Sequence, residues 1–209
     1  GEQRPVEAVT IGDQASIDRA LTFEKGSALF DVRHRLVLSF GAALPTPRFM
    51  GPAMAHVLGG WQLNGVIQAQ TGTPFTVYDP VTSIRYLTNR PNQVCDPNAN
   101  APHTVAQWFD TSCFARRALA DTATPGSTPR DSVRGPGFAK TDLSVFKTVT
   151  VRRNQGLQFR VEAFNLWNQT QFRNPGVGNT GNQIGTAQFG QITVAEDGRV
   201  VQLAVKYMF

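Results

Sequence analysis

The stretch that decides the fold is VQLAVKYMF, residues 201–209. Apolar or aromatic side chains occupy every second position, while Gln202 and Lys206 occupy the other parity. A period of two residues predicts a β-strand with one apolar face. The alternating residues are Val201, Leu203, Val205, Tyr207 and Phe209.

This stretch ends on an aromatic residue while the strand pattern is still running. The last strands of bacterial outer-membrane barrels have this pattern, with an apolar band that faces lipid and aromatic residues at the interface. We therefore expect residues 201–209 to form a barrel-closing or edge strand. The last strand of a soluble β-sandwich is the alternative reading of this segment.

The composition fits a sheet that is half polar and half apolar. Only 17% of the 209 residues are charged, and the mean hydropathy is −0.23. No apolar run reaches about 18 residues, so no transmembrane helix is expected. The polar start of the chain lacks a signal-peptide pattern. Because the first residue is glycine, we expect a processed chain, an excerpt or a fragment. The net charge is +5, but the basic residues are scattered, so no nucleic-acid partner is expected.

Five segments of alternating polarity predict an antiparallel, up-and-down β-meander of the outer-membrane barrel type. Glutamines and charges extend along the polar face of several segments, as in residues 60–70 and 157–167. Such a face is unusual for a packed sandwich and normal for a polar lumen. The expected strands are 32–44, 60–70, 138–151, 157–167 and 199–209.

The third and fourth segments are expected to form a hairpin about Asn154. Pairing them with residue numbers that sum to 308 places Val151 opposite Leu157 and Val145 opposite Ala163, and keeps each face consistent. A shift of one residue would exchange the faces.

The connections between the expected strands alternate between short and long. Residues 45–59 and 152–156 are short links, whereas 71–137 and 168–198 are long loops on one side of the sheet. Outer-membrane barrels have short periplasmic turns and long outer loops. We therefore divide the chain into an N-terminal loop or extended segment, 1–31, and a partial barrel, 32–209.

The same arrangement distributes the aromatic residues between the two rims of the barrel. Tyr207, Phe209 and Trp61 would lie near the periplasmic rim, and Trp167 near the opposite rim. Two aromatic girdles are therefore expected. Ordinary sheet aromatics are the alternative.

The two cysteines, Cys95 and Cys113, both lie in the long loop 71–137. Two cysteines cannot build a tetrahedral zinc site alone, and a disulfide in an extracytoplasmic loop is the better interpretation. It would stabilise the loop by roughly 3 kcal/mol. Two free thiols are the alternative.

No pattern in the chain predicts catalysis, a cofactor or a metal site. The segment from Asp96 to Asn100 begins like a calcium loop, but Ala101 and Gln107 replace the required glycine and glutamate. No nucleophile–base pair or paired carboxylates are spaced for acid–base chemistry. The sequence therefore predicts a protein that is not an enzyme.

A series of short motifs in residues 28–209 resembles the TonB-dependent outer-membrane receptors. The resemblance is to their Oar-like group, whose members carry a carboxypeptidase-regulatory-like N-terminal domain. The motifs occur in the family's order and are specific as a set, although each one alone is weak. They are FDVRHRLVLSF (30–40), LGGWQLNGVI (58–67), QTGTPFTV (70–77), WFDTS (108–112), RGPGF (134–138), DLSVFK (142–147), LQFRVEAFNLWN (157–168) and FGQI (189–192).

The resemblance implies the C-terminal part of a barrel of about 22 strands that is closed by a plug and lies in the bacterial outer membrane. Five strands are not a complete barrel, so transport by this chain alone is not expected. The open strand edges and the apolar face need partners. These are the rest of the receptor and the lipid bilayer, or further copies of the chain in an extracellular tube or filament. The transported ligand and any copy number cannot be read from the sequence.

Overall fold

The structure is a computed structural model that describes residues 24–46, 51–80, 89–117, 126–153 and 155–209. The chain divides into two compact units. The sheet unit consists of residues 32–72, 136–173 and 194–209, and the loop unit consists of residues 1–31, 73–135 and 174–193. Most of the expected N-terminal segment, residues 1–23, lies outside the described residues.

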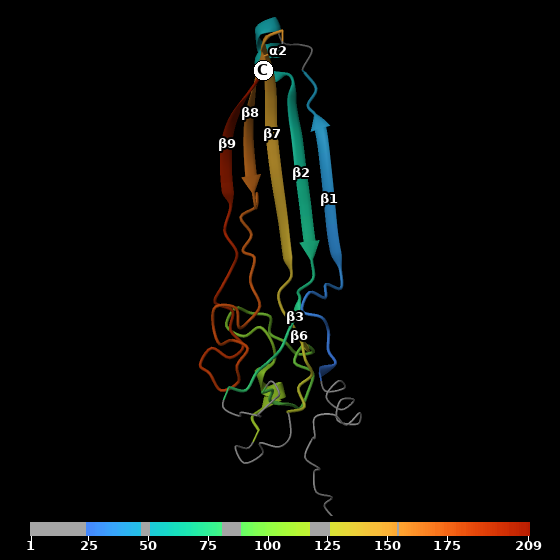
Figure 1. The fold of residues 1–209 in the computed structure, drawn as a ribbon, viewed down its shortest axis with the longest axis vertical. Helices are drawn as coiled ribbons and strands as arrows, with labels where there is room; N and C mark the ends of the chain where they lie inside the picture. The colour runs from blue at the N-terminus through green and yellow to red at the C-terminus, as the bar shows by residue number, and fades with distance from the viewer. Residues whose placement is uncertain (1–23, 47–50, 81–88, 118–125, 154) are drawn as a thin grey trace, which may run out of the picture. The chain divides into compact units, whose positions relative to one another are not determined.

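The sheet unit is built on one antiparallel sheet of five strands in the order β1-β2-β7-β8-β9, which follows the chain (Figure 1). The predicted all-β meander is therefore confirmed. Its strands are β1 (Arg35–Ala43), β2 (Trp61–Gln70), β7 (Phe138–Arg152), β8 (Gln155–Phe164) and β9 (Val200–Met208).

The strand β8 ends at Phe164, three residues before the end of the expected segment. Asn165 adopts a left-handed conformation with φ 54°, which does not continue a strand. Its backbone N–H donates to the Asp142 carboxylate, and its side chain exchanges hydrogen bonds with Gln169. The motif NLWN therefore forms a turn that places Trp167 outside the strand.

The β7–β8 hairpin has a different register from the predicted one. Val149 pairs with Leu157 and Leu143 pairs with Ala163, so the paired numbers sum to 306 and the expected partners are wrong by two residues. A shift of two residues leaves every side chain on the same face, so polarity alone does not distinguish the two registers. The pairing of Arg152 with Gln155 and the irregularity after Thr150 fix the observed register.

The short connection between β1 and β2 contains a helix, α2 (Pro52–Leu58), where the sequence predicts only a link between strands. It lies at the end of the sheet where the β7–β8 hairpin closes and where the chain reaches its C-terminus (Figure 1). The long connections leave the strands at the opposite end. None of the helical segments in the described residues is long and apolar enough to cross a bilayer.

The loop unit contains short paired segments instead of long strands. The strand β3 (Pro74–Phe75) pairs with β6 (Val133–Arg134), and β4 (Asn92–Gln93) pairs with β5 (Phe114–Ala115), which follows the 3₁₀ turn η1 (Thr111–Cys113). These pieces enclose a hydrophobic core. Its buried members are Phe75, Val77, Phe109, Cys113, Phe114, Val133 and Ile184.

Candidate functional site

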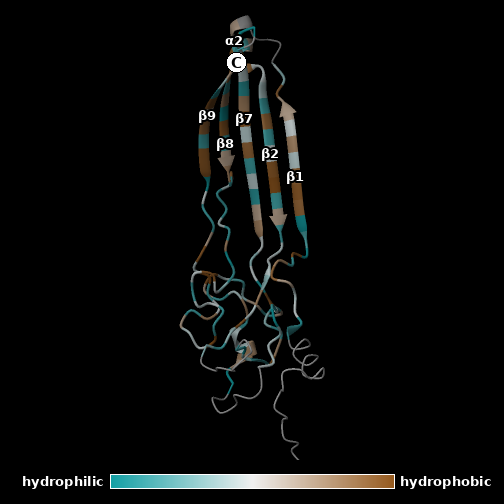
Figure 2. Cartoon of the chain, in the orientation of Figure 1, coloured by the Kyte–Doolittle hydropathy of each residue, from teal (hydrophilic) through white to brown (hydrophobic). Residues whose placement is uncertain are grey.

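The strand register gives the sheet one apolar face and one polar face. Across the strands, Leu38 pairs with Ile67, and Val145 pairs with both Leu63 and Val161. The alternation appears as brown and teal bands along β2 and β7 (Figure 2). The aliphatic and aromatic residues of the apolar face are Leu36, Leu38, Phe40, Ala42, Trp61, Leu63, Ile67, Ala69, Ala139, Leu143, Val145, Val149, Leu157, Phe159, Val161, Ala163, Val201, Leu203, Val205 and Tyr207.

Much of the apolar face is open to solvent in the isolated chain. Leu203 is 76% exposed, and Val201 and Val205 are more than half exposed. A monomeric soluble protein rarely exposes a continuous apolar surface of this kind. The face is therefore a candidate contact surface for an apolar environment.

Charged side chains on the polar face are arranged as local pairs. Arg160 lies 3.6 Å from the Glu162 carboxylate, donates to Gln158, and lies over the Phe146 ring. Lys140 pairs with Asp142 at 3.2 Å. These contacts satisfy the charges without a packed partner layer, as expected for a wall that faces water.

A cleft of about 560 Å³ lies on the polar face, near the end where the long connections leave the strands. Phe138, Phe164 and Phe172 supply aromatic walls, and the charged lining residues are Lys140, Glu196 and Asp197. Its volume lies in the range of small-molecule sites, and its lining combines aromatic rings with amide and charged side chains. The cleft can therefore accommodate an amphipathic molecule.

An ion pair outside the strands closes the segment that leads into β9. The Arg173 guanidinium donates to both carboxylate oxygens of Glu196, at 2.6 and 3.1 Å. This hydrogen bonding lowers the pKa of Glu196 and raises the pKa of Arg173. Backbone hydrogen bonds from Arg173 to Val194 and from Glu196 to Gln171 hold the same two segments together.

The predicted edge strand β9 forms one side of the sheet, and β1 forms the other. All residues of β1 are exposed, and β9 is exposed at all but two positions. Among the described residues, each of these strands has a neighbour in the sheet on one side only. Their outer backbone groups are therefore open for pairing with another strand.

The predicted girdle residues occupy both ends of the sheet. Trp61 starts β2, while Tyr207 and Phe209 stack with ring centroids 6.0 Å apart at the same end. Trp167 lies in the turn after β8, at the opposite end, and is 68% exposed. An interfacial role for these four residues stays a prediction.

In the loop unit, Cys95 and Cys113 form a disulfide with Cα atoms 4.8 Å apart. The cysteine sulfurs and the Asp110 carboxylate form a candidate metal group. Thiolate is the form that binds metal, and both sulfurs are engaged in the disulfide. Asp110 instead accepts hydrogen bonds from the backbone and hydroxyl of Ser112.

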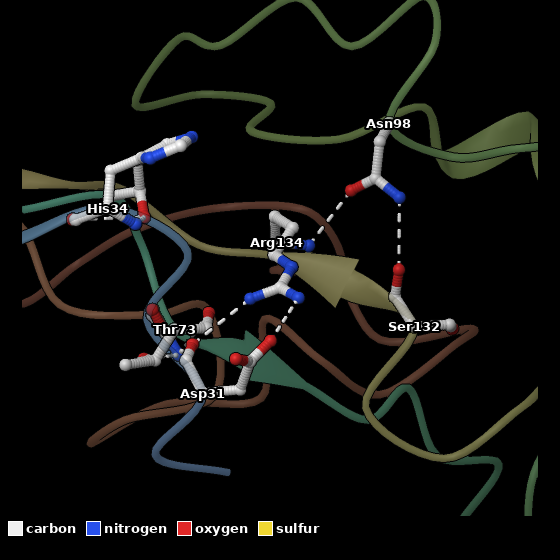
Figure 3. Close-up of polar contacts among 8 residues, drawn as sticks. Asp31, His34, Thr73, Asn98, Ser132 and Arg134 are labelled. Carbon is white, nitrogen blue, oxygen red and sulfur yellow. Dashed lines mark hydrogen bonds and ion pairs between the residues drawn. The ribbon is translucent and has the colours of Figure 1, made fainter. Parts of the chain in front are cut away.

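The segment from Asp96 to Asn100, which begins like a calcium loop, is a turn that is hydrogen-bonded to β6 and the residue before it. The Asp96 carboxylate accepts from the backbone and side chain of Asn98, and Asn98 in turn bonds the Ser132 carbonyl and the Arg134 N–H. Figure 3 shows the Asn98 amide bonded to both of these backbone groups and the Arg134 guanidinium directed toward Asp31. The Arg134 Nη2 donates to the Asp31 carboxylate at 2.5 Å. These polar contacts fix the shape of the loop unit.

Arg90 is a buried residue of the loop unit that forms an ion pair. Its side chain is 1% exposed and pairs with Glu24 at 3.1 Å. Burial lowers the pKa of Arg90, and the Glu24 charge opposes that shift. Sequence reasoning missed this ion pair because Glu24 and Arg90 lie far apart in the chain.

A family model described as an outer membrane beta barrel domain matches residues 6–202 of the chain. No curated protein and no solved structure matches the chain in the other two comparisons.

Proposed function

Because the chain belongs to the outer membrane beta barrel domain family, we propose that it is the C-terminal barrel segment of a TonB-dependent outer-membrane receptor. In this role the five strands form part of the barrel wall. The apolar face contacts lipid, and the polar face lines the lumen. The segment does not transport a ligand by itself.

The proposal rests mainly on the separation of apolar and polar side chains onto opposite faces of the sheet. The strand register separates a continuous apolar surface from a polar surface across all five strands. Lipid on one side and water on the other is the environment that such a wall matches. The order of the receptor-like motifs from residue 30 to residue 192 supports the finer assignment to TonB-dependent receptors.

The open edges of β1 and β9 support the rest of the barrel as the partner of this segment. Each edge presents backbone donors and acceptors that a neighbouring strand of the same barrel would pair. The cleft beside Phe138 and Phe164 would then face the lumen, where it contributes an aromatic surface to the path of an imported ligand.

The test is to identify the native polypeptide that contains this sequence. An antibody against the loop unit is used on fractionated membranes, followed by intact-mass measurement and crosslinking to TonB. We expect a polypeptide much longer than 22.8 kDa, in the outer-membrane fraction, that crosslinks to TonB. A free chain of 22.8 kDa in large, detergent-free particles would refute the proposal and support the extracellular assembly.

A further inference from the structure

The apolar face of the sheet contains a charged residue, Lys147. Lys147 of β7 pairs with Trp61 of β2 on one side and with Phe159 of β8 on the other. It is the single charged residue on this face of the described strands, counting β7 as far as the bulge after Thr150. Its side chain is nevertheless buried, since the residue is only 8% exposed. A buried ammonium group requires polar partners.

The helix α2 supplies these partners. The Lys147 ammonium donates to the backbone carbonyls of His56 and Val57, the latter at 3.0 Å. The last carbonyls of a helix lack partners within the helix, and they carry the negative end of its dipole. The end of α2 therefore binds Lys147 where lipid or water would otherwise surround it.

Trp61 completes the contact between the helix and the sheet. Its indole N–H donates to the Val57 carbonyl at 3.1 Å, and its ring centroid lies 5.9 Å from the Lys147 ammonium. Both contacts fix the C-terminal end of α2 on the apolar side of the sheet, because Trp61 and Lys147 are paired on that face.

The position of Lys147 along the strand sets the depth of this contact. Beyond it toward the same end, Val149, Leu157 and Tyr207 continue the apolar face. Two residues of strand correspond to about 6–7 Å. The contact therefore lies inside the apolar band and not beyond its edge.

One exposed side of α2 is also apolar. Met54, Val57 and Leu58 share one side of the helix at a spacing of i, i+3 and i+4, and Val57 is 63% exposed. His56 lies on the opposite side. The hydrogen bonds from Trp61 and Lys147 join the end of this helix to the apolar face of the sheet.

We propose that α2 is an interfacial helix that inserts its Met54–Val57–Leu58 side into the bilayer beside the barrel, and that Lys147 holds it there. The occupant of this surface is phospholipid, at the boundary between head groups and acyl chains. The inference rests on the proposed function only in that the apolar face of the sheet contacts lipid.

The test uses nitroxide labels in the complete polypeptide, reconstituted in phosphatidylethanolamine–phosphatidylglycerol vesicles. Because Cys95 and Cys113 are joined, a single introduced cysteine takes the label. We compare Val57→Cys with His56→Cys as the matched control, and measure collision with oxygen, which favours lipid, and with a nickel chelate, which favours water. We expect the oxygen-to-nickel ratio at position 57 to be several-fold higher than at position 56.

A label at Leu203→Cys distinguishes failure of the interfacial helix from failure of the proposed function, because Leu203 lies on the apolar face of β9 itself. If the label at 203 is in lipid while that at 57 is as aqueous as that at 56, the interfacial helix is refuted and the barrel assignment stands. If the label at 203 is itself aqueous, the proposed function fails.

Lys147→Met tests the anchoring role, with Lys206→Met on the polar face as its control. We expect Lys147→Met to lower the ratio at position 57 severalfold and to leave the ratio at 203 unchanged. Lys206→Met should change neither. An unchanged ratio at 57 in Lys147→Met would refute the role of Lys147.

Discussion

The two units of the chain place their apolar side chains in opposite ways. The described hydrophobic residues that are buried below the surface, such as Val77, Phe109 and Ile192, belong to the loop unit. In the sheet unit, large apolar residues such as Leu203 and Val205 are exposed. The loop unit therefore builds its own core, as a protein in water does, whereas the sheet unit leaves its apolar surface for another medium.

We expect the largest effect from removing one aromatic ring from the core of the loop unit, compared with removing one from the apolar face of the sheet unit. Phe109 is 1% exposed and packs edge-on against Phe75, Phe114 and Phe189. Phe109→Ala should destabilise the loop unit by about 3–5 kcal/mol, because it leaves a cavity in a packed core. Hydrogen exchange read by mass spectrometry should increase across the described residues of the loop unit and stay constant in the strands.

Phe159→Ala is the matched control for this substitution in the sheet. Phe159 is 43% exposed on the apolar face, so its loss leaves no enclosed cavity. An increase in hydrogen exchange of the strands in Phe159→Ala as large as that of the loop unit in Phe109→Ala would contradict the contrast between the units.

The second prediction tests the medium that the sheet unit faces. Leu203→Lys puts a charge on the apolar face and should cost about 2–4 kcal/mol in a bilayer if it lies near the midplane. Gln202→Lys puts the same charge on the polar face and should cost far less. The measurement is the free energy of folding into vesicles from urea titrations of the complete polypeptide, and similar costs at the two positions would argue against a lipid-facing sheet.

We expect the disulfide between Cys95 and Cys113 to stabilise the loop unit. Replacing both cysteines, in Cys95→Ser with Cys113→Ser, should lower its stability by up to about 3 kcal/mol because the disulfide restricts the unfolded chain. Limited proteolysis should cut the loop unit sooner and leave the strands protected. Ser112→Ala, next to the disulfide, is the control, and equal protease sensitivity of the two variants would contradict a stabilising disulfide.

The sheet unit could be predicted from the sequence because its pattern is local. A period of two residues assigns each side chain to one face of the sheet. An error of one or two residues in where a strand begins or ends does not change this assignment. The predicted pairing of Val145 with Ala163 is wrong because a shift of two residues keeps that assignment, and the turn near Arg152 decides the register.

The loop unit and the anchoring contact could not be predicted in the same way. Phe75, Phe109 and Val133 come from segments without a regular period, and β3 and β6 are only two residues long. The sequence did carry one signal for the anchor, since Lys147 stands between Val145 and Val149 at an apolar position. Its partners are backbone carbonyls of α2, and no side-chain pattern identifies these.

The smallest expected effect concerns pH and the exposed pair Arg173–Glu196. Because the pKa of Glu196 is lowered in the folded chain, its contribution to stability is complete above the unfolded pKa and is lost as the pH falls through the folded pKa. The raised pKa of Arg173 keeps that group charged throughout this range. Thermal unfolding of the wild type should therefore lose slightly more stability than Glu196→Gln as the pH falls below about 4.

The pair bridges the segments that lead from β8 to β9, so the effect belongs to the sheet unit. Salt should weaken it, because the two groups are exposed and water and ions screen their attraction. Asp197→Asn, one residue away, is the control and should retain the pH dependence of the wild type. If Glu196→Gln showed the same acid loss as the wild type at low salt, another carboxylate would carry the acid sensitivity of the sheet unit, and the closure before β9 would depend on the backbone hydrogen bonds alone.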